Sequence, residues 1–361
     1  MVTQAVEKPA TAETLAATLL EAAGAGQAVF PVGGGRANEM GNPADREGIE
    51  LHTSGLDRVL EHSQGDMVVS VEAGVTLEAL QAQLEKAGQF LPLDPHGSPG
   101  HTIGGLLASG WTGPLRHRYG SPRDYLIGIR IALPDGKLAS AGGRVVKNVS
   151  GYDMMKLHLG ALGTMGVIVA ASFKVFPRPL ADVTVGIECG NVGEAWAAAE
   201  KALALPMPPA ALEVIPAGEV IARFFGSPEA TARVVSDLGW TKRDGSIWAE
   251  HARRAPSAWA RIAVPRAHTQ AMAERLGGDG WWGSAGLGIL NWEITGGADE
   301  VRAVRGAAEA AGGSLAIMAG PEALRREVGA WGTPPATLPV MRRLRDAFDP
   351  LRTINPGRFV V

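Results

Sequence analysis

Cysteine is almost missing from the sequence. The 361 residues contain one cysteine, Cys189, so the chain cannot form an internal disulfide bond. It also cannot supply a cysteine zinc site, or the roughly four thiolates that hold an iron–sulfur cluster. Any iron–sulfur cluster that works with this chain must therefore belong to another protein.

The sequence also lacks a strong net charge and long apolar runs. Its 34 lysine and arginine residues nearly balance its 37 aspartate and glutamate residues, which leaves a net charge of -3. Such a chain has no general field that attracts nucleic acid, so we do not expect nucleic acid as a partner. No run of about 18 apolar residues occurs, and the first 20 residues lack a basic segment followed by an apolar one. We therefore expect no transmembrane segment and a cytoplasmic protein, whose only membrane contact would be peripheral, at the inner membrane and through partners.

Glycine, in contrast, is abundant and grouped. It supplies 48 of the 361 residues, about twice its usual share of roughly 7%. Most of the dense clusters precede Phe176, at 33–35, 97–113 and 151–166. Glycine has no Cβ, so each cluster allows the backbone to approach a ligand closely, and several such surfaces suit an extended dinucleotide.

The first cluster, read as GGGRAN at 33–38, excludes two familiar nucleotide motifs. Its spacing does not match the G-x-G-x-x-G nicotinamide fingerprint, and no Gly-Lys-Ser/Thr follows as a Walker loop requires. FAD is therefore the dinucleotide that the three clusters together favour. Taken alone, residues 33–35 fit a flexible turn equally well.

Caps and apolar spacing predict alternating helices and strands before residue 94. Thr11 and Thr76 are the expected N-caps of two helices, which end near Gly24 and Gly88. Residues 94–120 predict a long glycine-rich loop, and long ordered loops are usually functional. After residue 180, strand-like pieces alternate with alanine-rich helical stretches, which predicts a second α+β domain. Strands are expected at 27–32, 67–72, 126–133 and 167–176.

Six segments carry a resemblance that none carries alone. They are PVGGG at 31–35, VSVEAGVTLEAL at 69–80, PGHTIGGLLASGWTGPLRHRYG at 99–120, DYLIGIRIALPDGK at 124–137, KNVSGYDMMKLHLGALGTMGVI at 147–168 and FDPLRTINPGRF at 348–359. In this order they resemble the vanillyl-alcohol oxidase type of FAD-binding protein. SGWTGP at 109–114 replaces the Asn-Ala-Gly-Gly stretch of most relatives, and in this the chain is similar to the branch of FAD-binding E subunits of glycolate oxidase.

The resemblance implies an α+β fold with a PCMH-type FAD-binding domain of two subdomains at 1–178. An α+β cap domain at 179–340 and a tail at 341–361 that returns to the flavin domain would follow. By resemblance, the residues that hold FAD are Pro31, Gly33, Gly34, Gly35, Arg36, Ala37, Asn38, Pro95, Gly104, Gly105, Ser109, Gly113, Gly163, Thr164, Gly166, Ile168, Asn355, Gly357 and Arg358.

Two features of related enzymes are absent from this sequence. Family members with covalent flavin commonly carry a histidine just after the glycine turn, where this chain has Arg36, so we expect non-covalent FAD. Relatives that oxidise D-2-hydroxy acids carry a Gly-His-x-Gly-Asp-Gly-Asn-x-His segment in the cap. The best counterpart, at 283–291, has Ser284, Leu287, Ile289 and Asn291 at the chemical positions. We therefore expect no metal site and assign no catalytic residue.

Other chemically capable side chains have two readings each. His96 and His101 lie in the glycine-rich stretch, where they either are structural or approach the flavin. Tyr119 and Tyr152 either line the flavin or belong to the core. The Trp281-Trp282 pair is either core or part of an interface.

The resemblance implies the FAD-binding subunit of a glycolate oxidase complex. Its partners would be a second flavin subunit and an iron–sulfur subunit that receives the electrons when glycolate becomes glyoxylate. Two alternatives stay open: a stand-alone FAD-dependent dehydrogenase of D-2-hydroxy acids such as D-lactate, and a flavin-free assembly subunit. The substrate in the first two cases is a small 2-hydroxy acid.

Overall fold

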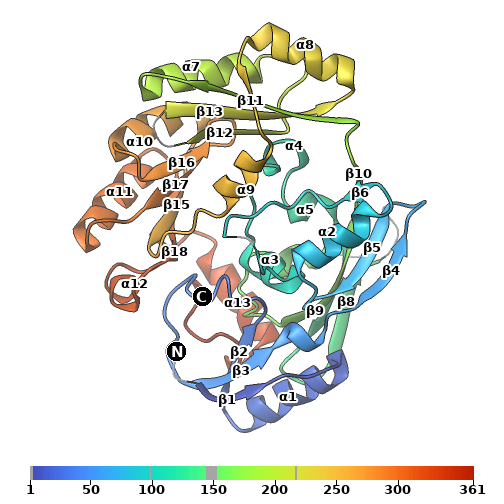
Figure 1. The fold of residues 1–361 in the computed structure, drawn as a ribbon. Coiled ribbons are helices and arrows are strands. Elements are labelled where there is room, and N and C mark those ends of the chain that lie inside the picture. Colours follow the sequence, from blue (N-terminus) through green and yellow to red (C-terminus); the bar gives the residue numbers. More distant parts are fainter. Residues whose placement is uncertain (1–2, 98, 144–152, 216–217) are drawn as a thin grey trace.

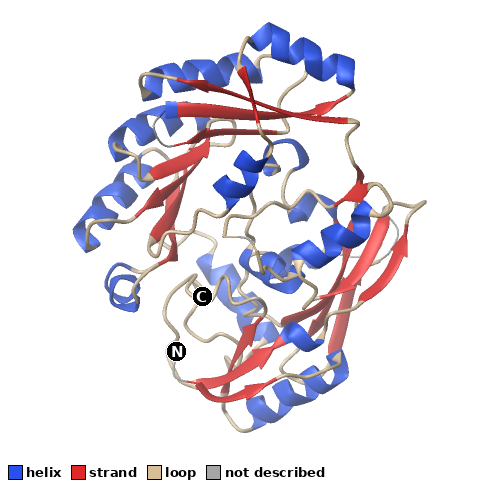
Figure 2. Cartoon of the chain, in the orientation of Figure 1, coloured by secondary structure: helices blue, strands red, loops and turns tan. Residues whose placement is uncertain are grey.

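The computed structural model describes residues 3–97, 99–143, 153–215 and 218–361. Its strands form three- and five-stranded sheets in the first half of the chain, an eight-stranded sheet in the second, and a two-stranded pair (Figures 1 and 2). None of the helices in these residues is long and apolar enough to cross a membrane.

The smallest of the three larger sheets is parallel and begins the chain. It has the order β1 (Thr3–Glu7), β3 (Gly48–His52), β2 (Ala28–Val32) and packs against α1 (Ala12–Gly24). Thr11 is the N-cap of α1 as predicted, because its hydroxyl accepts a hydrogen bond from the Thr14 amide. The expected strand at 27–32 is confirmed as β2, which leads directly into the glycine turn.

The five-stranded sheet is antiparallel. Its order is β4 (Val59–Ser63), β5 (Val68–Glu72), β9 (Val167–Lys174), β7 (Leu126–Ala132), β8 (Leu138–Gly142). Helix α2 (Leu77–Glu85) begins at the predicted cap, Thr76, and buries Leu77, Leu80 and Leu84 in the core beneath this sheet. The short strands β6 (Gln89–Phe90) and β10 (Phe176–Pro177) pair beside it.

The segment 94–120 is not the uninterrupted loop that its glycines predict. It contains α3 (Ile103–Ser109) and α4 (Arg116–Tyr119). Thr102 caps α3, and Ile103, Leu106 and Leu107 are buried in the core, so tertiary packing outweighs the low helix propensity of Gly104 and Gly105. Helices α5 (Pro122–Tyr125) and α6 (Met155–His158) are also short, and η1 (Thr53–Gly55) is a single 3-10 turn.

The second half of the chain forms an antiparallel sheet of eight strands. Their order is β14 (Thr241–Arg243), β11 (Ala181–Glu188), β13 (Glu219–Gly226), β12 (Ala211–Ile215), β16 (Trp281–Ser284), β17 (Ile289–Glu293), β15 (Trp259–Ala263), β18 (Ser314–Ala319). Helices α7 (Val192–Leu203), α8 (Pro228–Leu238), α10 (Thr269–Leu276) and α11 (Ala298–Ala310) cover its outer face, while α9 (Ser246–Ala252) lies on the inner side (Figure 1). The remaining elements are η3 (Arg266–His268), α12 (Glu322–Val328) and α13 (Leu338–Phe348).

Buried side chains and the tail are among the contacts that join the halves of the chain. Trp259 and Met318, from β15 and β18, are buried in the same core as the five-stranded sheet. After α13, the tail runs back beside β2, where Ile354 pairs with Val29. The fold is thus an α+β FAD-domain type with a following α+β sheet, while the domain limits at 178 and 340 stay a prediction.

Candidate functional site

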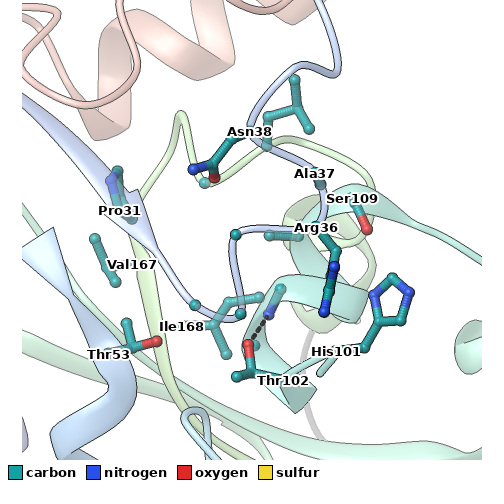
Figure 3. Close-up of a pocket in the computed structure, with 18 of the residues that line it drawn as sticks. Pro31, Arg36, Ala37, Asn38, Thr53, His101, Thr102, Ser109, Val167 and Ile168 are labelled. Atoms are coloured by element: carbon teal, nitrogen blue, oxygen red, sulfur yellow. Dashed lines mark hydrogen bonds between the residues drawn. The ribbon is translucent and has the colours of Figure 1, made fainter. Parts of the chain in front are cut away.

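One pocket gathers most of the predicted FAD residues. It encloses about 700 Å³ with its open mouth, and it lies between the turn after β2, helix α3, the segment before β9 and the tail (Figure 3). Fourteen of the nineteen predicted residues line it: Pro31, Gly33, Gly34, Gly35, Arg36, Ala37, Asn38, Gly104, Gly105, Ser109, Gly163, Ile168, Asn355 and Arg358.

The glycines of the turn are required first by the protein itself. A Cβ on Gly34 would lie 1.7 Å from the carbonyl oxygen of Gly100, and one on Gly33 would lie 2.1 Å from Oγ1 of Thr102. The turn therefore packs directly on the segment that starts α3. Gly35 has a φ of +74°, which favours glycine, and a Cβ there would meet only Nδ2 of Asn38, at 3.8 Å.

The tail holds the other end of this turn in place. Arg358 is 5% exposed, and its Nη2 donates to the carbonyl oxygens of Ala37, Asn38 and Met40 at 3.1, 2.7 and 2.8 Å. Asn355 donates through Nδ2 to the carbonyl oxygen of Leu162 at 2.5 Å. These bonds connect three segments far apart in sequence and fix the shape of the pocket.

The electrostatics of the pocket favour an anion. Its lining includes the arginines at 36 and 358 and no aspartate or glutamate among the described residues. Burial lowers the pKa of Arg358 to about 10, so it keeps its charge at pH 7. Burial also lowers the pKa of His101, whose ring lies beside Arg36 (Figure 3), and the imidazole is neutral there. Glycine surfaces, backbone amides and two cations fit the pyrophosphate of a dinucleotide.

Five predicted residues lie outside the pocket. Gly113 packs on Asp94, whose carbonyl oxygen would be 1.7 Å from a Cβ there, and Gly166 packs on the carbonyl oxygen of Ala132. Thr164 and Gly357 line a separate cavity beside α13, and Pro95 lines another between α2 and α9. Contacts of these five residues with FAD stay a prediction.

Six lining residues lie outside the predicted set: Thr53, His101, Thr102, Ala108, Leu162 and Val167. Thr102 was detectable, since a threonine directly before an apolar helical stretch is a typical N-cap, and its Oγ1 accepts from the Gly105 amide at 3.3 Å (Figure 3). No local pattern in the sequence marks Thr53 as a pocket residue, because its place depends on the long-range pairing of β2 with β3.

The structure also places most of the aromatic residues for which the sequence allows two interpretations. Tyr119 packs edge-on against Phe90 and Phe176, with ring centroids 5.6 and 5.0 Å apart, and does not line the pocket. Trp281 and Trp282 are buried, as the core reading predicts. Gly151 and Tyr152 lie outside the described residues.

The cap segment at 283–291 spans the end of β16, the turn after it and the start of β17. Ser284, Leu287, Ile289 and Asn291, the four residues at the chemical positions of the resembling motif, all line one small cavity. His96 also lines it. In the described part of the chain, no three His, Cys, Asp or Glu side chains gather as a metal site would require.

Comparison with known proteins identifies an FAD-binding domain in this chain. A family model described as FAD binding domain matches residues 3–142. The chain is 30% identical over 312 residues to the glycolate oxidase subunit GlcE of Escherichia coli (strain K12), covering 83% of this chain and 84% of that protein. It is 36% identical over 151 residues to the mitochondrial D-lactate dehydrogenase (cytochrome) of Arabidopsis thaliana, which covers 42% of this chain and 26% of that protein.

A solved structure supports the fold over nearly the whole chain. The chain superposes on an alkyldihydroxyacetonephosphate synthase with a TM-score of 0.71 and 17% sequence identity, covering 98% of this chain and 77% of that one. The cofactor of the matched family is FAD. Because the similarity to the glycolate oxidase subunit extends through 84% of that protein, the chain belongs to the family of FAD-binding glycolate oxidase E subunits, among the FAD-dependent oxidoreductases.

Proposed function

We propose that this chain is the FAD-binding subunit of a glycolate oxidase complex. The observation that carries the proposal is the extent of the similarity to the E subunit, which includes the second, cap-forming half of the chain. The D-lactate dehydrogenase match is limited to 42% of this chain, so it supports the FAD domain and a 2-hydroxy acid chemistry more than a shared cap.

The pocket described above is the proposed FAD site. Arg36, Asn38 and the glycine turn would hold the pyrophosphate, and Gly163 and Ile168 the adenine and ribose end. Arg36 stands at the position where a histidine would attach the ring covalently, so the cofactor is held by non-covalent contacts alone. When bound, FAD supplies a two-electron acceptor for oxidation of a 2-hydroxy acid.

Partners complete the reaction. Oxidation of a hydroxy acid needs a base for the hydroxyl proton, and the cap positions that would supply metal or base are Ser284, Leu287, Ile289 and Asn291 in this chain. A second flavin subunit with an intact cap segment would therefore oxidise glycolate to glyoxylate. A partner iron–sulfur subunit would take the electrons, since one cysteine cannot hold a cluster.

The test compares the chain alone with the assembled complex. The FAD-loaded chain and its complex with both partners are mixed anaerobically with glycolate, and the flavin absorption band is followed. We expect the band of the isolated chain to stay oxidised and that of the complex to bleach. Bleaching of the isolated chain by glycolate or D-lactate would identify a stand-alone dehydrogenase, and failure to take up FAD would identify an assembly subunit.

A further inference from the structure

A cavity beside the FAD pocket is lined by arginines that the proposed FAD site does not use. We name it the α13 cavity, because α13 and the tail after it supply most of its wall (Figure 1). Water-sized molecules can occupy about 330 Å³ of it, within the range of about 300–1,000 Å³ for ligand pockets. The lining residues that matter for its chemistry are Asp45, Arg342, Arg345, Arg352, Asn355 and Phe359.

The α13 cavity and the FAD pocket are neighbours with different linings. Asn355 is the one described residue that lines both of them. Its side-chain amide donates to the carbonyl oxygen of Leu162 at 2.5 Å, so it is held in the wall between the two spaces. A molecule in the α13 cavity would therefore be a second ligand, bound beside FAD and not in its place.

Three arginines give the α13 cavity its charge. Arg342 and Arg345 are three residues apart in α13, so they lie on one face of the helix, and Arg352 follows in the turn after it. Arg345 is 7% exposed and pairs with Asp346 at 2.8 Å. Arg342 and Arg352 are exposed, and neither forms an ion pair within the residues that the structure describes. Their guanidinium donors are therefore free for a ligand.

The backbone holds Arg352 in an uncommon conformation. Its φ is +52°, in the left-handed region that residues with a Cβ rarely adopt. The buried carboxylate of Asp349 accepts hydrogen bonds from the amides of Thr353 and Ile354, at 2.9 and 2.7 Å. Arg46 donates to the carbonyl oxygen of Arg352 itself. The turn is thus fixed on both sides of Arg352, and backbone strain of this kind clusters at ligand sites.

The lining side chains indicate the chemistry of the ligand. Guanidinium groups bind phosphate oxygens through pairs of N–H donors, so three of them suit a phosphate, which has several anionic oxygens. Asp45 also lines the cavity and forms no ion pair in the described part of the chain. An ionised carboxylate only accepts hydrogen bonds, so the ligand group beside Asp45 needs a donor such as a hydroxyl. The ring of Phe359 adds an apolar surface.

We propose that the α13 cavity binds a phosphate monoester that carries hydroxyl groups. The phosphate is held by the three arginines of the cavity, a hydroxyl donates to Asp45, and the carbon skeleton packs on Phe359. This ligand is additional to FAD and to the substrate that the flavin oxidises, so the site does not depend on which hydroxy acid that substrate is.

The test is calorimetric titration of the apoprotein and of the FAD-loaded chain with inorganic phosphate, ribose 5-phosphate and ribose. We expect ribose 5-phosphate to bind more tightly than phosphate, ribose not to bind, and both affinities to be the same with and without FAD. Arg342→Gln and Arg352→Gln should each weaken both anions at least about tenfold, the loss expected for a charge-assisted hydrogen bond. Asp45→Ala should remove the preference for ribose 5-phosphate without weakening the binding of phosphate.

The matched control is Arg343→Gln, which removes an exposed arginine of the same helix that does not line the cavity, and it should change neither affinity. Circular dichroism of every variant checks that it is folded. No binding of either anion at millimolar concentration, or equal affinities in the wild type and both arginine variants, would overturn the proposal. Binding that FAD abolishes would also overturn it, because the cavity would then belong to the FAD site. Equal affinities for phosphate and ribose 5-phosphate would overturn the choice of a hydroxylated ester.

Discussion

Replacing Gly34 by alanine tests how the pocket is built. The new Cβ would lie 1.7 Å from the carbonyl oxygen of Gly100, whereas ordinary contacts begin at 3.4 Å. The turn and the segment before α3 must separate by the difference, about 1.7 Å. Gly34 does not have a positive φ, so the whole effect is steric and not conformational.

The magnitude follows from the cost of overpacking, about 1–3 kcal/mol. If the free protein relieves the clash by moving the turn, FAD binding must restore the turn, and the FAD dissociation constant rises about 5- to 150-fold. If the turn cannot move, the same cost lowers the free energy of unfolding. The losses in FAD-binding free energy and in the free energy of unfolding should therefore add up to about 1–3 kcal/mol.

The assay is titration of the apoprotein with FAD, followed by flavin absorption, together with urea unfolding of the apoprotein. Gly24→Ala is the matched control, since Gly24 ends α1 with nothing within 4 Å of its notional Cβ, and it should bind FAD like the wild type. A Gly34→Ala protein with unchanged FAD affinity and unchanged stability would refute the packing argument.

Three further predictions concern stability. Arg358→Met removes three hydrogen bonds to backbone carbonyls, of which that of Ala37 keeps the Met40 amide as a donor, and should lower the free energy of unfolding by about 2–4 kcal/mol in urea titrations; an unchanged midpoint would contradict it. Burial lowers the pKa of His158 to about 4. The buried neutral ring therefore contributes fully to the free energy of unfolding above pH 6.5, and this contribution is lost as the pH falls towards 4. The loss of stability between pH 6.5 and pH 5 should be smaller by about 1.6 kcal/mol in His158→Gln, and an equal loss would refute this. Thr76→Ala removes the N-cap hydrogen bond of α2 and should lower the free energy of unfolding by about 1 kcal/mol in the same assay. An unchanged free energy of unfolding would show that the cap does not stabilise the protein.

Local signals in the sequence predicted local structure well. Thr11 and Thr76 marked the two N-terminal helices because a capping hydroxyl satisfies an amide within the same turn. The glycine turn predicted one wall of the pocket, because residues without a Cβ allow the backbone to approach a ligand closely. The same local reasoning failed at α3, where buried leucines outweigh two glycines.

Long-range contacts were beyond local reasoning. Arg358 donates hydrogen bonds to carbonyls about 320 positions away, and the small cavity lined by the cap segment joins Arg116 of one half of the chain to Arg261 of the other. The resemblance placed Arg358 near the flavin, but its bonds to the turn depend on the parallel pairing beside β2. The sequence marks the cap-segment residues that line this cavity, but it does not bring the two arginines together, since they lie in segments with unrelated patterns.

We propose that the pocket after β2 holds FAD without a covalent bond and that this chain alone does not oxidise glycolate. The most direct measurement is the visible absorption spectrum of the FAD-loaded chain, recorded anaerobically before and after glycolate, and then of the supernatant after acid precipitation. We predict a flavin band that glycolate leaves oxidised and that passes fully into the supernatant. No bound flavin, flavin that stays with the precipitate, or a band bleached by glycolate would each contradict the account.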